Sequence, residues 1–188
     1  MATTINADTV SGGAIITGDA SGELGLQAAG TTALTLASGN VTVANKMTVV
    51  GTSSTAGLKI ADVLETATVS ATAATGTINY DVTTQAVLYY TSNASANWTV
   101  NFRGSSGTSL NTLMATGESL TVAFLVTQGS TAYYNSAVQV DGSSVTPKYQ
   151  GGTAWAAGNA SGVDVYVYTI IKTGSATFSV FASQTRFA

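Results

Sequence analysis

The acidic side chains offer the clearest opening for catalysis in this 188-residue sequence, which contains neither histidine nor cysteine. Two carboxylic acids flanking a glycosidic bond can cleave it, one as acid and the other as base or nucleophile. Asp62 and Glu65 are close in sequence but have no aromatic neighbour to hold a sugar, and Asp141 precedes Gly142 in a dipeptide typical of turns. The nine acids are Asp8, Asp19, Glu23, Asp62, Glu65, Asp81, Glu118, Asp141 and Asp164. We expect structural roles for all of them and no enzymatic activity.

The signatures of other chemistries are missing as well. Without histidine there is no Ser-His-Asp or Cys-His arrangement and no imidazole to bind a metal. Without cysteine there is no disulfide and no thiolate site. The sequence has no Gly-x-Ser-x-Gly elbow, no phosphate-binding glycine loop and no run of alternating oxygen donors for calcium. We expect no catalytic residue, no cofactor and no metal ion.

The two tryptophans differ in their sequence surroundings. Trp98 lies in the alternating run NWTVNF, which is typical of a strand and favours a place in the core or in an interface. Trp155 lies in QGGTAWAAGNASG, a Gly/Ala-rich stretch without a strand pattern. An aromatic residue in such a loop contacts a neighbouring chain, binds a ligand such as a sugar, or packs locally. All three roles remain open for Trp155.

The low charge content indicates an obligate assembly. Charged residues make up 8% of the chain, against roughly 25% in ordinary globular domains. A soluble monomer covers its exterior with such residues, and this chain has too few of them. The net charge is −3 and the six basic residues are scattered singly, so we expect no binding to nucleic acid.

The sequence predicts neither a secretion signal nor a membrane span. The start, MATTINADTV, lacks the basic and apolar regions of a secretion signal. The longest apolar run, VDVYVYTII at 163–171, is too short to span a bilayer. We expect synthesis in a cytoplasm and no membrane insertion.

Residues 1–57 show a rhythm of very short strands and turns. In TTALTLASGNVTVANKMTVVG, residues 31–51, apolar doublets alternate with polar residues at period two, which predicts strands of about three to five residues. A flexible linker is the alternative, but linkers lack such doublets. Because an isolated hairpin is marginal in water, we expect three copies to bury the doublets together. The predicted particle or subunit contacts are Leu24, Leu26, Leu34, Leu36, Val41, Val43, Met47 and Val49.

The remainder of the chain predicts a joint at 58–75 and an aromatic domain at 76–188. All eight tyrosines, both tryptophans and all five phenylalanines lie between Tyr80 and Phe187. Turn signals at intervals of roughly ten residues predict an all-β, antiparallel sandwich of jelly-roll type. The predicted strands are 63–70 in the joint, then 77–83, 86–91, 97–103, 118–127, 132–140, 144–149, 163–172 and 175–187.

Two predicted strands are apolar on both faces. In VDVYVYTII the valines alternate with tyrosines, and in LTVAFLV, residues 120–126, both faces again carry apolar residues. A strand of a monomeric sandwich normally has one wet face. We therefore expect these strands to lie between the core and a partner chain, with the C-terminal strand docked near that contact.

The chain also resembles a known class of protein. SGELGLQAAGTTALTLASGNVTVANKMTVVGTSS resembles the N-terminal segments of phage fibre and related virion proteins. Three stretches, DVTTQAVLYYTSNASANWTVNFRG, ATGESLTVAFLVTQGSTAYYNSAVQVDGSSVTPKYQGG and VYTIIKTGSATFSVFASQTRFA, resemble a module of virion structural proteins from tailed phages, notably those infecting marine cyanobacteria. The resemblance implies a homotrimeric appendage of the virion.

These observations predict a bacteriophage virion structural protein made in the host cytoplasm. In the leading hypothesis it is a trimeric fibre whose residues 1–57 form a stalk or attach to capsid, neck or tail proteins, with the aromatic domain as a knob. The first alternative is a capsid cement or decoration protein that stabilises the shell. The second is an adhesin for host attachment that binds surface glycans through the loop around Trp155.

Overall fold

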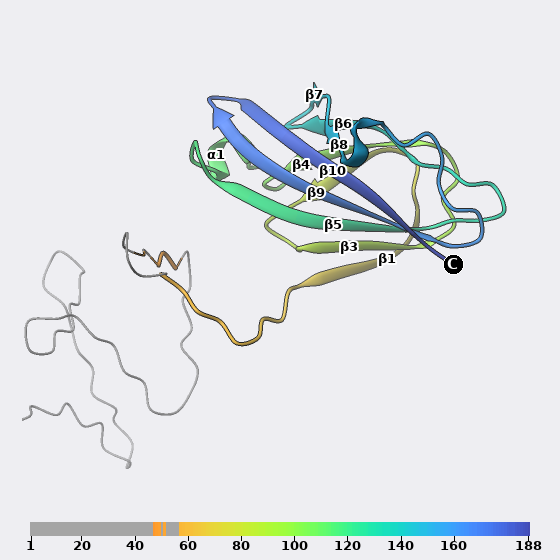
Figure 1. The fold of residues 1–188 in the computed structure, drawn as a ribbon, viewed down its shortest axis with the longest axis horizontal. Helices are drawn as coiled ribbons and strands as arrows, with labels where there is room; N and C mark the ends of the chain where they lie inside the picture. The colour runs from red at the N-terminus through yellow and green to blue at the C-terminus, as the bar shows by residue number, and fades with distance from the viewer. Residues whose placement is uncertain (1–46, 50, 52–56) are drawn as a thin grey trace, which may run out of the picture. The chain divides into compact units, whose positions relative to one another are not determined.

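A computed structural model describes residues 47–49, 51 and 57–188 of the chain. The chain divides into two compact units, Met1–Lys59 and Ile60–Ala188. The second unit consists almost entirely of strands, arranged in two sheets (Figure 1). The all-β fold class predicted from the sequence is therefore confirmed for the described part of the chain.

The larger sheet has six strands in the order β1-β3-β5-β9-β10-β8. Their bounds are β1 Ala67–Ala73, β3 Val87–Ser92, β5 Ser119–Thr127, β9 Val163–Gly174, β10 Thr177–Phe187 and β8 Lys148–Tyr149. In Figure 1 the strands from β10 to β1 lie side by side along this layer. The smaller sheet has four strands in the order β2-β4-β6-β7. Their bounds are β2 Gly76–Asp81, β4 Trp98–Arg103, β6 Asn135–Val140 and β7 Ser143–Val145.

The chain alternates between the two sheets from β1 to β6, and this path corrects the antiparallel prediction. Strands β1, β3 and β5 enter the larger sheet in turn, and β2, β4 and β6 enter the smaller one. Because each strand returns to its sheet after one visit to the other, neighbours run the same way. The parallel pairs are β1–β3, β3–β5, β2–β4, β4–β6 and β8–β10, whereas β5–β9, β9–β10 and β6–β7 are antiparallel.

The turn signals in the sequence cannot distinguish a hairpin from such a crossing. Only Ala74 and Thr75 separate β1 from β2, yet the two strands belong to different sheets. Gly76 follows with φ of +58°, a left-handed conformation that a residue without Cβ adopts most easily. A short turn-rich linker therefore fits a crossing between sheets as well as a return within one sheet.

Several element boundaries differ from the predicted ones. The strand expected at 63–70 occupies Ala67–Ala73, so the predicted joint contributes the edge strand β1 to the larger sheet. The strand expected at 144–149 is divided into β7 and β8 around the buried Pro147, which has no N–H to donate to a sheet. The short helix α1, Leu110–Leu113, was not predicted from the sequence; its N-cap Ser109 accepts a hydrogen bond from the N–H of Thr112.

The core lies between the two sheets and is mainly aromatic. Trp98 of β4 meets Phe124 of β5 and Tyr166 of β9, with ring centroids 6.2 and 5.6 Å apart. Phe102 of β4 meets Tyr168 of β9 at 4.9 Å. All five rings are at most 1% exposed, and burying each side chain of this size contributes roughly 1.5–3 kcal/mol. The prediction of a core or interface place for Trp98 is confirmed.

Candidate binding surfaces

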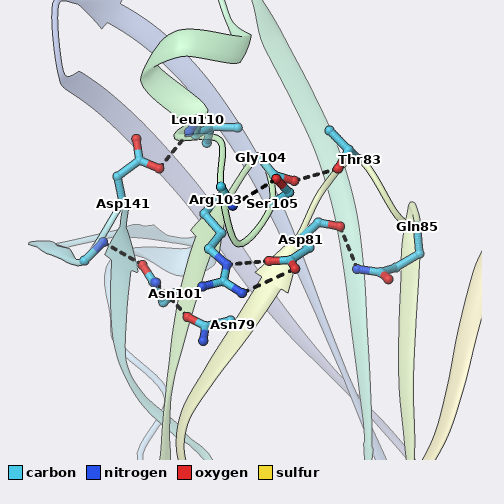
Figure 2. A network of polar contacts seen from close by, with 12 residues as sticks. Asn79, Asp81, Thr83, Gln85, Asn101, Arg103, Gly104, Ser105, Leu110 and Asp141 are labelled. Carbon is cyan, nitrogen blue, oxygen red and sulfur yellow. Dashed lines mark hydrogen bonds and ion pairs between the residues drawn. The ribbon is translucent and has the colours of Figure 1, made fainter.

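A polar network joins the ends of β2 and β4 to the turn after β6 (Figure 2). The parallel register sets Asn79 opposite Asn101 and Asp81 opposite Arg103. Arg103 Nε donates to Asp81 Oδ1 at 2.5 Å, and Asn101 Nδ2 donates to Asn79 Oδ1 at 2.8 Å. Asn101 Oδ1 in turn accepts from the N–H of Gly142 at 2.8 Å. The network ties neighbouring backbones together, which is a structural function.

Charged side chains hold both ends of the short helix α1. The Asp141 carboxylate accepts hydrogen bonds from the N–H groups of Leu110 and Asn111, at 2.6 and 2.9 Å. Lys172 Nζ donates to the carbonyls of Asn111 and Met114 at the other end, at 2.6 and 2.8 Å. These signs match the helix dipole. Asp141 therefore serves the backbone, as its Asp-Gly dipeptide predicted.

Asp164 is a fully buried acid on β9. Its Oδ2 accepts from Gln128 Nε2 at 2.9 Å and from the N–H of Asn159 at 3.0 Å, whereas Oδ1 has no partner among the described residues. Burial raises the pKa of this carboxyl above its usual value, and the two hydrogen bonds oppose that effect. Gln128 also bonds the N–H and carbonyl of Tyr133, so Asp164 belongs to a network that fastens loops to the sheet.

Trp155 packs against the folded unit through its own chain. Its ring lies 4.8 Å from Tyr149, 5.1 Å from Tyr166 and 6.4 Å from Tyr168, and its Nε1 donates to the carbonyl of Asn135. The side chain is half-buried and also lines a surface pocket. Local packing thus accounts for part of the ring, and contact with a ligand or a neighbouring chain stays a prediction.

The outer face of the larger sheet carries no charged side chain on β1, β3, β5 and β9. The charged residues of these strands, Asp164 and Lys172 of β9, are both buried on the inner side. The register aligns apolar residues across the four strands on the outer side. One row is Val69, Tyr89, Leu125 and Val165, and the next is Ala67, Val87, Ala123 and Val167. We call these two rows the outer face; they confirm the prediction that β5 and β9 are apolar on both sides.

The outward direction of the β9 valines follows from the sequence, but the extension of the outer face to β1 and β3 does not. Val69 is 66% exposed and belongs to β1, a strand predicted a few residues too early. Alternation within one strand gives the direction of its side chains, whereas the rows depend on which strands are neighbours.

Six of the eight predicted contact residues of the N-terminal segment fall in the part of the chain that the structure does not describe. Leu24, Leu26, Leu34, Leu36, Val41 and Val43 lie outside the described residues. Met47 and Val49 are described, and they are 64% and 40% exposed.

The described residues contain neither a cluster of metal ligands nor a helix that could span a membrane. In the part of the chain that the structure covers, no group of three or more acidic residues could hold a metal ion. Within the same residues no helix has the length and apolar character needed to cross a bilayer. Comparison of the whole chain with family models, curated proteins and solved structures gives no match.

Proposed function

We propose that the chain is a bacteriophage virion structural protein, one subunit of a homotrimeric fibre or appendage whose residues 1–57 attach it to the particle. The observation that carries the proposal is the uncharged outer face formed by β1, β3, β5 and β9. Contiguous apolar surface on this scale is uncommon on soluble monomers and marks an interaction site.

The outer face favours another copy of the chain as the partner. A polypeptide with 8% charged residues has little surface of any other kind to offer, so identical copies match one another in polarity. Closed rotational symmetry lets each copy use the same surfaces. The number three comes from the resemblance to virion proteins, and a fibre with a β-rich knob accounts for both the short strands that the sequence predicts in residues 1–57 and the aromatic domain.

A single introduced charge tests the subunit contact. Val165 ends one row of the outer face, on β9, and lies between Leu125 of β5 and Thr185 of β10 in the register. Val165→Lys places an ammonium there, and we expect the full-length variant to change from trimer to monomer in sedimentation analysis. Val165 is half-buried, so circular dichroism must show that the variant keeps its strand content.

Ala137→Lys is the matched control for this substitution. Ala137 lies on β6 of the smaller sheet and is exposed, so the same charge appears outside the proposed contact. We expect this variant to retain the mass of the unmodified protein. A folded Val165→Lys variant whose mass equals that of the unmodified trimer would overturn the proposed contact.

The virion assignment requires a measurement on particles. Quantitative mass spectrometry of purified phage should detect the chain at a low copy number if it forms a fibre. A copy number comparable with that of the major capsid protein would favour the decoration alternative. Absence of the chain from purified particles would refute both.

A further inference from the structure

A groove runs along β10 at the border of the larger sheet. It consists of two adjoining pockets of about 500 and 310 Å³ that share Gln150, Ala182 and Ser183. Strand β8 forms one side because it pairs with β10 over Lys148 and Tyr149. We call this feature the β10 groove. It lies at the β8–β10 end of the sheet and adjoins the proposed subunit contact on β1, β3, β5 and β9, with which it shares Val167.

Aromatic rings line both pockets of the β10 groove. Phe181 is 41% exposed and lies in the larger pocket together with Val167. Trp155 lies in the smaller pocket, and its orientation is fixed by Tyr149, Tyr166 and the hydrogen bond to the carbonyl of Asn135. Rings held by the protein lose little conformational freedom when a ligand binds, which favours affinity.

The β10 groove is also lined by polar residues whose side chains make no hydrogen bond within the described part of the chain. The side chains of Gln150, Thr153 and Ser183 line the groove and make no hydrogen bond to any other described residue. An amide offers two donors and an acceptor, and each hydroxyl offers one donor and acceptor sites. Aromatic surface together with amide and hydroxyl groups in the same groove suits the C–H faces and hydroxyls of a sugar.

The charge of the groove narrows the class of sugar. Lys148 is the only charged residue among those that line the two pockets. Its Nζ lies 5.2 Å from the Phe181 ring centroid, and the register of β8 with β10 sets the two residues opposite each other. One ammonium without a neighbouring carboxylate attracts an anionic group. A phosphate would gain from the bidentate donors of an arginine, and no arginine lines either pocket.

The geometry points to a binding site for an acidic saccharide, with a sugar ring beside Phe181, its carboxylate at Lys148 Nζ, and the next sugar toward Trp155. The site lies within one chain and goes beyond the proposed structural role.

Calorimetric titration of the full-length protein with paired oligosaccharides tests the site. The probes are oligogalacturonate, an N-acetylneuraminate oligomer and a glucuronate-containing oligomer, each beside a neutral oligosaccharide of the same length. We expect at least one acidic probe to bind more tightly than its neutral counterpart. Failure of all three to bind would overturn the inference.

Three variants assign the binding to the groove. Phe181→Ser should weaken binding at least tenfold, and Lys148→Gln should remove the preference for the acidic probe over the neutral one. Phe187→Ser is the matched control, because Phe187 is 54% exposed on the same strand and does not line either pocket. Unchanged binding in Phe181→Ser, or equal losses in Phe181→Ser and Phe187→Ser, would refute the assignment. All three variants should keep the wild-type mass, so a failure here is distinct from a failure of the proposed trimer.

Discussion

Asp141 combines two separable effects, which makes it the sharpest test of the fold. Its carboxylate binds the N–H groups of Leu110 and Asn111, and its backbone has φ of 51°. Loss of a capping side chain costs about 0.5–2 kcal/mol. Left-handed backbone costs a residue with Cβ about 1–2 kcal/mol more than it costs glycine, and aspartate tolerates it better than alanine. Asp141→Ala should therefore destabilise the protein by about 1–2 kcal/mol, since it loses the cap and its backbone strain is only slightly greater than that of aspartate.

Two further substitutions at Asp141 divide that loss. Asp141→Gly loses the cap but relieves the strained backbone, so we expect a cost of about 1 kcal/mol or less. Asp141→Asn keeps an acceptor oxygen and tolerates the backbone conformation, and we expect a cost of about 1 kcal/mol from the lost charge. Alanine should thus be the worst of the three, and less stable than the glycine variant by about 1 kcal/mol.

Urea denaturation followed by tryptophan fluorescence measures these differences, provided that the slope with denaturant stays constant. Asp62→Ala is the control, because Asp62 is exposed and, among the described residues, its carboxylate accepts a hydrogen bond only from the adjacent N–H of Val63. We expect a change of less than about 0.5 kcal/mol for this control. Equal stabilities of the alanine and glycine variants would refute the strain argument, and an unchanged alanine variant would refute the capping argument.

Three other substitutions test separate features. Ala176 has φ of 48°, so Ala176→Gly should raise stability by about 1 kcal/mol in thermal unfolding. Because the pKa of Asp164 is raised in the folded protein, the free energy of unfolding falls as pH rises through that pKa. Asp164→Asn should make the free energy of unfolding less dependent on pH above about 4, as measured by urea unfolding at several pH values. A Trp155→Ala variant with unchanged urea stability would contradict local packing against three tyrosines, for which we expect a loss of about 2 kcal/mol.

The sequence predicted most strands because their apolar residues alternate and their turns are marked. Tyr166 and Tyr168 on one side of β9 and Val165 and Val167 on the other follow from period two alone. In the joint the alternation of apolar residues predicted the wrong start of the strand. Val63 and Leu64 are apolar yet 57% and 100% exposed, and β1 begins only at Ala67. Residue type gives an average burial, and the actual burial depends on the neighbouring strands.

Pairing and surface features depend on long-range geometry that local patterns do not contain. The alternation of β1 to β6 between sheets is invisible in the turns, so the antiparallel prediction was wrong for the four pairs that it creates. It was also wrong for β8–β10. The β10 groove joins Lys148 to Phe181 through a two-residue strand that no periodicity could reveal. The Gly/Ala-rich loop around Trp155 marks this residue in the sequence, but only the fold shows that it packs against Tyr149, Tyr166 and Tyr168.

Sedimentation equilibrium of the unmodified full-length protein measures the proposed trimer itself. We expect a single species of three 18.8 kDa chains, which is about 56 kDa, with no dissociation on dilution. A stable, soluble species of 18.8 kDa across the same concentrations would contradict it, because the uncharged outer face would then have no partner.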